Sequence, residues 1–260
     1  MKVPCLSQSP ARIVNQVILK GIVTVMSTKD ITADLALARL LQISSVSLPV
    51  GGYAFSQGLE YAVECEWLKK VGDVETWIRL QLDENLARVD LPILREVMLA
   101  TASKDWLRLL YLNDLLLASR ETKELRLSDT AMGEALLRLL KSLDFELDFL
   151  AELTRQGGTV NDISFVMLFG LCAQQWNIPY RLASMGFTWS WLENQVAAAT
   201  KLVPLGQTQA QQLLVLLQPV LGEVINAAEQ VQEHEIGGGL PALAIASALH
   251  ETQYSRLFRS

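Results

Sequence analysis

Hydrophobic side chains recur every three or four residues along most of the chain. The stretch after Asp73 places them on one helix face, at Val74, Trp77, Ile78, Leu82, Leu86 and Val89. Asp73 itself carries the kind of side chain that caps a helix start. A second stripe, from Leu213 to Val231, predicts a long helix over residues 207–235. Pro219 lies inside this helix and is expected to bend it, because proline has no backbone N–H to donate.

The same spacing predicts helices along nearly all of the remaining sequence. They are expected at residues 32–44, 56–67, 92–101, 105–118, 129–141, 145–155, 163–176, 180–203 and 241–251. No run alternates over the length of a strand, and the turns between helices are short. The pattern therefore predicts an all-α fold, a single compact multi-helix domain of about ten helices over residues 27–250.

The two chain ends are expected to lie outside this domain. In the N-terminal extension, residues 1–26, polar residues such as Arg12 and Lys20 interrupt the apolar stretches, which disfavours a signal peptide. Residues 1–25 are expected to be dispensable, since Met26 opens a second polar start. No window reaches the roughly 18 apolar residues that a membrane span needs, so we expect a soluble protein.

The amino-acid composition indicates a globular protein and argues against some classes of partner. The 260 residues are 50% hydrophobic and 19% charged, enough for a substantial core. The net charge of −6 disfavours a duplex nucleic-acid surface, which needs clustered cations. Three cysteines without a CxxC pair indicate a reducing compartment, and Cys65 and Cys172 are expected to be buried as small hydrophobic residues.

Groups for catalysis are scarce. The two histidines are His234, flanked by glutamates and expected on the surface, and His250, expected to be structural or interfacial. No catalytic residue, cofactor or stable metal site is predicted. Two alternatives from other classes remain: a helical metal-binding enzyme using Glu229, His234 and Glu235, and a peripheral membrane protein bound through its N-terminal extension.

One glycine-rich loop, residues 48–58, enters a predicted helix. It lacks the Lys-Ser/Thr ending of a phosphate-binding loop. It is expected to form a helix–helix corner in which Gly51 and Gly52 adopt unusual dihedrals and Ser56 caps the next helix.

The last eleven residues carry three large apolar side chains, Tyr254, Leu257 and Phe258, beside two arginines. An exposed end of this composition is expected to be buried on another protein. No lysine or arginine occurs between Lys201 and Arg256, whereas five glutamates do, at positions 223, 229, 233, 235 and 251. That acidic stretch fits a solvated face and one half of a charge-complementary interface equally well.

Several motifs, in order, resemble the UreF family of urease accessory proteins. They are Leu-Pro-Val-Gly-Gly-Tyr-Ala-Phe-Ser-Gln-Gly-Leu-Glu at 48–60, Ala-Arg-Val-Asp-Leu-Pro at 87–92, Ser-Arg-Glu-Thr-Lys-Glu-Leu-Arg at 119–126, Trp-Leu-Glu-Asn-Gln at 191–195, Leu-Val-Pro-Leu-Gly-Gln-Thr at 202–208 and the segment 250–260. The resemblance runs from about residue 34 to the end. It implies an all-α, dimeric, non-enzymatic protein.

The resemblance also implies partners. UreF proteins bridge UreD, called UreH in some organisms, and the GTPase UreG, in an assembly that delivers nickel to apo-urease in the cytoplasm. The resemblance implies that UreD/UreH contacts the tail, residues 251–260. The implied contact residues are Glu251, Thr252, Gln253, Tyr254, Ser255, Arg256, Leu257, Phe258 and Arg259. The implied contacts to UreG lie at the corner, at Pro49, Gly51, Gly52, Tyr53, Phe55, Ser56 and Glu60. No nucleic acid and no membrane are implied.

Overall fold

The computed structural model describes residues 28–157 and 162–259, and the predictions for residues 1–26 lie outside this range. The described residues form helices and contain no strand, which confirms the all-α prediction. Of the described residues, those from Leu40 onward form one compact unit, and those up to Arg39 belong to a separate unit.

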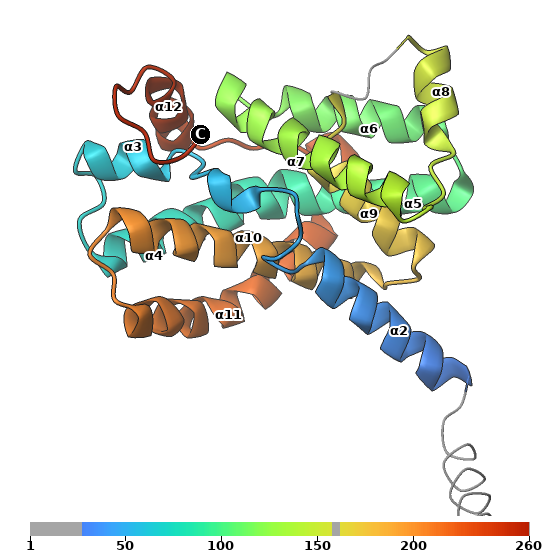
Figure 1. Ribbon diagram of the computed structural model, residues 1–260, viewed down its shortest axis with the longest axis horizontal. Helices are drawn as coiled ribbons and strands as arrows, with labels where there is room; N and C mark the ends of the chain where they lie inside the picture. Colours follow the sequence, from blue (N-terminus) through green and yellow to red (C-terminus); the bar gives the residue numbers. More distant parts are fainter. Residues whose placement is uncertain (1–27, 158–161, 260) are drawn as a thin grey trace, which may run out of the picture. The chain divides into compact units, whose positions relative to one another are not determined.

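The helices follow one another with short connections (Figure 1). Their bounds are α2 Thr28–Ile43, α3 Leu59–Glu64, α4 Val71–Gln81, α5 Leu91–Ser103, α6 Trp106–Ala118, α7 Lys123–Ser142, α8 Phe149–Arg155, α9 Phe165–Gln175, α10 Tyr180–Leu202, α11 Gln207–Gln230 and α12 Pro241–His250. Short 3-10 turns lie at Gly52–Ala54 and Glu233–Glu235.

Helices α5 and α9 form the centre of the core. Nearly every residue of α9 is buried, because its sequence is apolar on all sides. Gly170 lets α5 approach closely, since a Cβ there would lie 2.7 Å from a methyl carbon of Val97. Phe169 completes an aromatic cluster with Phe165 and Phe187. Helix α7 covers α9 on one side, and α10 and α11 pack together on another (Figure 1).

A π-helical segment, Leu82–Asp90, joins α4 to α5 without a break. Its buried Asp90 lies 2.6 Å from a guanidinium nitrogen of Arg120, which also contacts the buried carboxylate of Asp129 at 2.7 Å. Burial raises the pKa of Asp90 to about 6, while the charge of Arg120 opposes that rise. This three-residue cluster ties α7 and the turn before it to the π-helical segment.

Several predicted helix bounds were wrong. Helix α7 begins at Lys123 and not at Asp129, because the hydroxyl of Thr122 accepts the backbone N–H of Leu125 and caps the helix there. Helix α11 ends at Gln230, short of residue 235. The guanidinium of Arg95 binds the carbonyl oxygens of Ala228, Glu229 and Val231 and so satisfies the helix end. Pro219 lies inside α11 as expected.

Asp73 lies inside the first turn of α4, where its carboxylate accepts the backbone N–H groups of Lys69 and Lys70. Asp73 is therefore not the N-cap residue, which is Lys70, but its carboxylate satisfies backbone N–H groups at the helix start from the third helical position. Cys172 is buried as predicted, and burial raises the pKa of its thiol. The prediction for Cys65 was wrong, because the residue follows the end of α3 and its side chain is exposed.

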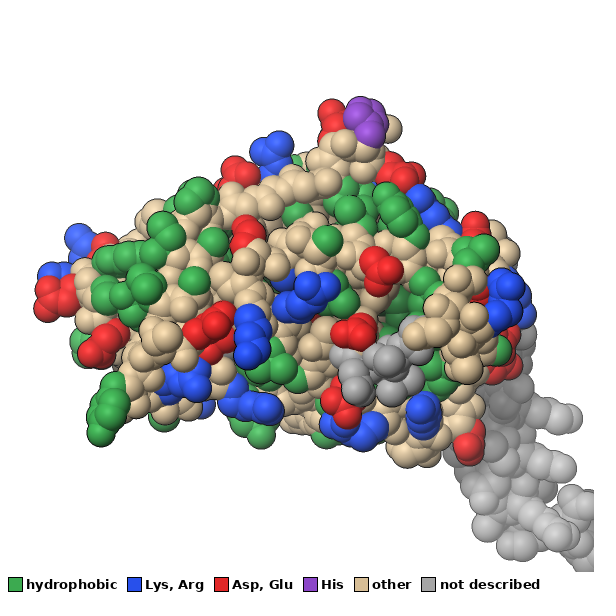
Figure 2. Space-filling model, turned by 90° about the horizontal axis from the view of Figure 1, so that it is seen from above, with side chains coloured by type: hydrophobic (Ala, Val, Ile, Leu, Met, Phe, Trp, Pro, Cys, Tyr) green, Lys and Arg blue, Asp and Glu red, His purple; other side chains and the backbone are tan. Residues whose placement is uncertain are grey.

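Figure 2 shows acidic and basic side chains interspersed over one face of the molecule, without a large area of a single sign. Of the helices that the structure describes, none is long and apolar enough to cross a membrane.

Candidate functional site at the tail and the corner

The tail folds back onto the corner, defined here as residues 49–60. The backbone N–H groups of Leu257 and Phe258 donate to the two carboxylate oxygens of Glu60, at 2.6 and 2.9 Å. One residue further on, the N–H of Arg259 donates to the carbonyl oxygen of Ala54 at 2.8 Å. Because a carboxylate accepts backbone N–H groups strongly, Glu60 fixes the course of the tail.

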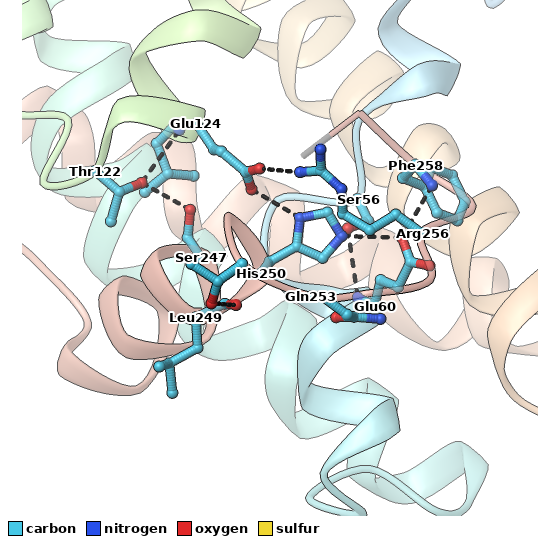
Figure 3. Close-up of polar contacts among 12 residues, drawn as sticks. Ser56, Glu60, Thr122, Glu124, Ser247, Leu249, His250, Gln253, Arg256 and Phe258 are labelled. Carbon is cyan, nitrogen blue, oxygen red and sulfur yellow. Dashed lines mark hydrogen bonds and ion pairs between the residues drawn. The ribbon is translucent and has the colours of Figure 1, made fainter.

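His250, at the end of α12, lies between two buried carboxylates (Figure 3). Its Nε2 is 3.0 Å from Glu60 and its Nδ1 is 2.7 Å from Glu124, and the imidazole ring is wholly inaccessible to solvent. A carboxylate can only accept a hydrogen bond. When both carboxylates are ionised, both ring nitrogens must donate, and the ring then carries a positive charge.

Arg256 completes this polar cluster by donating to the second oxygen of Glu124 at 2.7 Å. Glu60, Glu124, His250 and Arg256 thus form one cluster, in which the two carboxylates face the Arg256 guanidinium and both nitrogens of the His250 ring. Pairing on this scale is what permits charged groups to be buried, since each unpaired charge would cost several kcal/mol. The expectation of a structural role for His250 is confirmed.

The tail presents two different sides. Phe258 is buried, with the ammonium group of Lys201 5.3 Å from its ring centroid, and the Arg259 guanidinium lies 5.7 Å from the centroid of Phe55. Tyr254 and Leu257 are exposed. The prediction that Phe258 is exposed was therefore wrong, because its own chain supplies a site for it that includes Lys201 and, 198 residues earlier in the sequence, Glu60.

The other tail residues lie mostly at the surface. Glu251, Thr252, Ser255, Arg256 and Arg259 are exposed, and Gln253 is half-buried. Thr252 continues the end of α12 through a bond from its hydroxyl to the carbonyl oxygen of Leu249. The tail is thus a folded loop with an accessible outer side.

The corner is also divided. Pro49 and Tyr53 are exposed and Gly51 and Gly52 are half-buried, whereas Phe55, Ser56 and Glu60 are buried. Of these three, Phe55 and Glu60 contact the tail. Gly51 has a left-handed backbone, at φ 76°, but Gly52 does not; the second left-handed glycine is Gly58, which directly precedes α3. The prediction that Ser56 caps α3 was wrong, because the N-cap residue is Gly58; the Ser56 hydroxyl only accepts the N–H of Glu60 at a long 3.4 Å.

A cavity of about 90 Å³ lies beside the corner, with Gly52 and Phe55 among its lining residues. Gln81 and Gln195 also line it, and each has a buried amide atom with no hydrogen-bond partner in the described residues. A polar cavity of this size has room for ordered water.

The alternative metal ligands do not form a site. Glu229 lies on α11 and pairs with Arg181 at 3.1 Å, while His234 and Glu235 lie in the 3-10 turn that follows. Within residues 28–157 and 162–259, no group of three or more His, Cys, Asp or Glu side chains is placed to hold a metal ion. His234 is on the surface, as predicted.

Two of the glutamates in the acidic stretch belong to ion pairs within the chain. Glu229 contacts Arg181, and Glu233 contacts Arg108 at 2.5 Å. Hydrogen bonding to Arg108 is also what lowers the pKa of Glu233 most. The charges of these two glutamates are therefore already paired within the chain, so neither a solvated acidic face nor an unpaired half of an interface describes this part of the stretch.

Sequence reasoning missed Glu124 and Arg120 as organising residues. Both lie in the motif at 119–126, yet only their contacts with residues outside that motif, Asp90 and His250 among them, reveal their roles. No local pattern distinguishes these two side chains from the exposed charges beside them.

Comparison with known proteins identifies the family. The UreF family profile matches residues 68–218. Over 235 residues the chain is 57% identical to the urease accessory protein UreF of Marinomonas sp. (strain MWYL1), covering 90% of this chain and 99% of that protein. It is 45% identical to the same-named protein of Alkalilimnicola ehrlichii over 90% of this chain and 100% of that one, and 43% identical to that of Pseudoalteromonas translucida over 88% and 96%. The chain therefore belongs to the UreF family of urease accessory proteins.

Proposed function

We propose that the chain is a urease maturation chaperone that bridges UreD (UreH) and the GTPase UreG for GTP-dependent nickel insertion into apo-urease. It acts in the cytoplasm, as a homodimer within the complex, and it catalyses no reaction itself. The observation that carries this proposal is family membership along 90% of the chain. The packing of the tail against the corner agrees with it, because that packing presents accessible side chains from both segments.

The outer side of the tail is the proposed UreD contact. Tyr254 and Leu257 are large, exposed apolar residues on a loop whose backbone Glu60 already holds. A preformed loop has less conformational entropy to lose on binding than a free peptide, where fixing each residue costs about 1–2 kcal/mol. Burial of Tyr254 on a partner would stabilise the complex by about 2–3 kcal/mol.

The exposed part of the corner is the proposed UreG contact, with Tyr53 as its largest accessible side chain. A scaffold influences GTP hydrolysis or nickel release only when it binds the GTP and GDP forms of its partner with different affinities. It need not contact the nucleotide. The proposed role is therefore differential binding.

Paired surface variants test this proposal without disturbing the fold. Tyr254→Ser with Leu257→Ser is expected to abolish co-purification of UreD, and Tyr53→Ser to abolish recruitment of UreG to a preformed complex with UreD. Leu107→Ser, at another exposed apolar site, on α6, is the control and should leave both intact. Retention of both partners by the tail and corner variants would refute the assigned surfaces, and failure of the unaltered chain to bind either protein would refute the bridging role.

A further inference from the structure

The cavity beside the corner contains two buried amide groups with unmatched atoms. Gln81 and Gln195 both line the cavity and are 2% and 1% exposed. Within the part of the chain that the structure describes, Nε2 of Gln81 has no acceptor and Oε1 of Gln195 has no donor. Because buried polar atoms are almost always hydrogen-bonded, exceptions of this kind indicate a molecule bound between them.

The orientation of the Gln195 amide follows from its neighbours. The indole N–H of Trp191 can only donate, and it donates to Oε1 of Gln57 at 2.8 Å. The amide nitrogen of Gln195 donates to the same oxygen at 3.2 Å. Because Gln57 must present its oxygen to Trp191, Gln195 must present its nitrogen to Gln57. The unmatched atom of Gln195 is therefore an acceptor.

One wall of the cavity is the π-helical segment. This segment contributes four lining residues, Asn85, Leu86, Val89 and Asp90, and Gln81 directly precedes it. π-helical turns are rare and occur frequently at functional sites. A π-helical run of nine residues that begins beside an unmatched amide therefore favours a wall shaped for a ligand.

The charged groups at the cavity are already paired. Arg120 is the only lysine or arginine among the described residues that line it, and its guanidinium lies 2.6 Å from Asp90 and 2.7 Å from Asp129. An anion would therefore meet no free cation. A cation has no acceptor to offer and would leave Nε2 of Gln81 unmatched. The two glutamines instead select an uncharged molecule that both donates and accepts hydrogen bonds.

The volume of the cavity limits the size of this molecule. A volume of about 90 Å³ holds roughly six non-hydrogen atoms, at about 15 Å³ for each water-sized position. Val46 and Glu121, which are exposed, also line the cavity, so it reaches the surface of the protein. A carboxamide or a urea fits this space, and it carries a carbonyl oxygen and N–H groups on one rigid plane.

We propose that the cavity binds a small uncharged amide, of the carboxamide or urea class. Its carbonyl oxygen accepts from Nε2 of Gln81, and one of its N–H groups donates to Oε1 of Gln195. Apolar lining residues such as Leu86 contact the rest of the molecule. Binding here requires no partner protein, so the site is tested separately from the proposed bridging function.

The test compares four small probes of similar size on the isotopically labelled full chain: acetamide, urea, acetate and guanidinium. Each is added up to about 0.1 M, too little to unfold a typical protein, and NMR follows the side-chain amide signals of Gln81 and Gln195. Acetamide and urea should shift these signals saturably, with a dissociation constant of about 1 mM to 10 mM. Acetate, which only accepts, and guanidinium, which only donates, should bind about tenfold more weakly or less.

Glutamine variants test the assigned contacts. Gln81→Met and Gln195→Met keep the length of the side chain and remove its hydrogen-bonding group. Each should weaken acetamide binding about tenfold or more, followed at the backbone N–H signals of the π-helical segment. Gln211→Met, at an exposed position on α11, is the matched control and should bind as the unaltered chain does. Circular dichroism checks that all variants are folded.

Three results would overturn the proposal. The absence of a saturable shift with acetamide and urea would show that the cavity holds water only. Equal or tighter binding of acetate or guanidinium would make the cavity a site for ions. Acetamide binding that neither Gln81→Met nor Gln195→Met weakens would place the bound amide elsewhere on the protein.

Discussion

The carboxylate of Glu60 accepts the backbone N–H of Phe258 at 2.9 Å, across 198 residues of sequence. Glu60 lies on α3 and belongs to the corner, and Phe258 is the buried anchor of the tail. The two segments that the resemblance assigns to different partners therefore share one carboxylate.

Removing the charge of Glu60 is expected to release the tail. Glu60→Gln leaves the side chain its size but replaces charge-assisted hydrogen bonds with weaker neutral ones. Amide hydrogen exchange at Leu257 and Phe258 should accelerate about tenfold or more. Glu64→Gln, at an exposed position on the same helix, is the control and should leave these rates unchanged. Equal exchange in both variants would show that Glu60 does not hold the tail.

Loss of the His250 ring is expected to destabilise the whole compact unit. His250→Ala leaves Glu60 and Glu124 buried without the cation between them. Breaking a buried ion pair in this way costs about 3–5 kcal/mol. Urea denaturation measures the change, with His234→Ala on the surface as the control, expected within about 0.5 kcal/mol of the unaltered chain. A similar small cost for both variants would contradict the charged arrangement.

The raised pKa of Asp90 predicts in which direction the stability of the protein changes with pH. Its pKa is raised from 3.8 to about 6, first by burial, while Arg120 opposes the rise. Between these values the folded protein holds a proton that the unfolded chain has released. The free energy of unfolding therefore falls as pH rises from about 4 to about 6.

Asp90→Asn removes this titration, so the unaltered chain should lose stability relative to the variant over that window. Urea denaturation at several pH values measures the difference. If both proteins showed the same pH dependence, Asp90 would titrate normally.

Gly133 is expected to tolerate no side chain. A Cβ at this position in α7 would overlap the carbonyl oxygen of Ile163 and lie 2.8 Å from the carbonyl carbon of Ser164. Backbone cannot move aside as a flexible side chain can, so Gly133→Ala should cost about 3 kcal/mol or more.

The control for this substitution is Gly72→Ala on α4, where nothing lies within 4 Å in the described residues. Alanine favours a helix over glycine, so this variant should be unchanged or about 1 kcal/mol more stable. Equal thermal stability of the two variants would rule out the close approach of Ile163 to α7.

The helices with a regular stripe of apolar residues could be predicted from the sequence. Stripes such as Leu213 to Val224 identify a helix and its buried face without tertiary information, because burial of one face is what makes such a helix stable. Helix ends were harder. Arg95 ends α11 from a distance of more than 130 residues in sequence, and no local signal reports that contact.

The candidate site was only partly readable. The residue composition of the tail and of the corner singled out both segments, and the resemblance to the UreF family supplied their expected partners. That Phe258 packs on its own chain depends on Glu60, Ala54 and Lys201, which come together only in the folded protein. The sequence led us to expect an exposed peptide. In the structure the tail is a loop that packs on its own chain through Phe258, and Tyr254 and Leu257 remain accessible.

We propose above that this chain holds UreD and UreG in one assembly. The most direct measurement is the intact mass of the complex that forms when the chain is co-expressed with UreD, UreG and apo-urease. We expect a mass that contains the chain, UreD and UreG together. Deletion of Thr252–Ser260 should remove UreD from the complex and leave the helical circular dichroism unchanged. A complex of UreD and UreG that assembles and activates urease without this chain would contradict it.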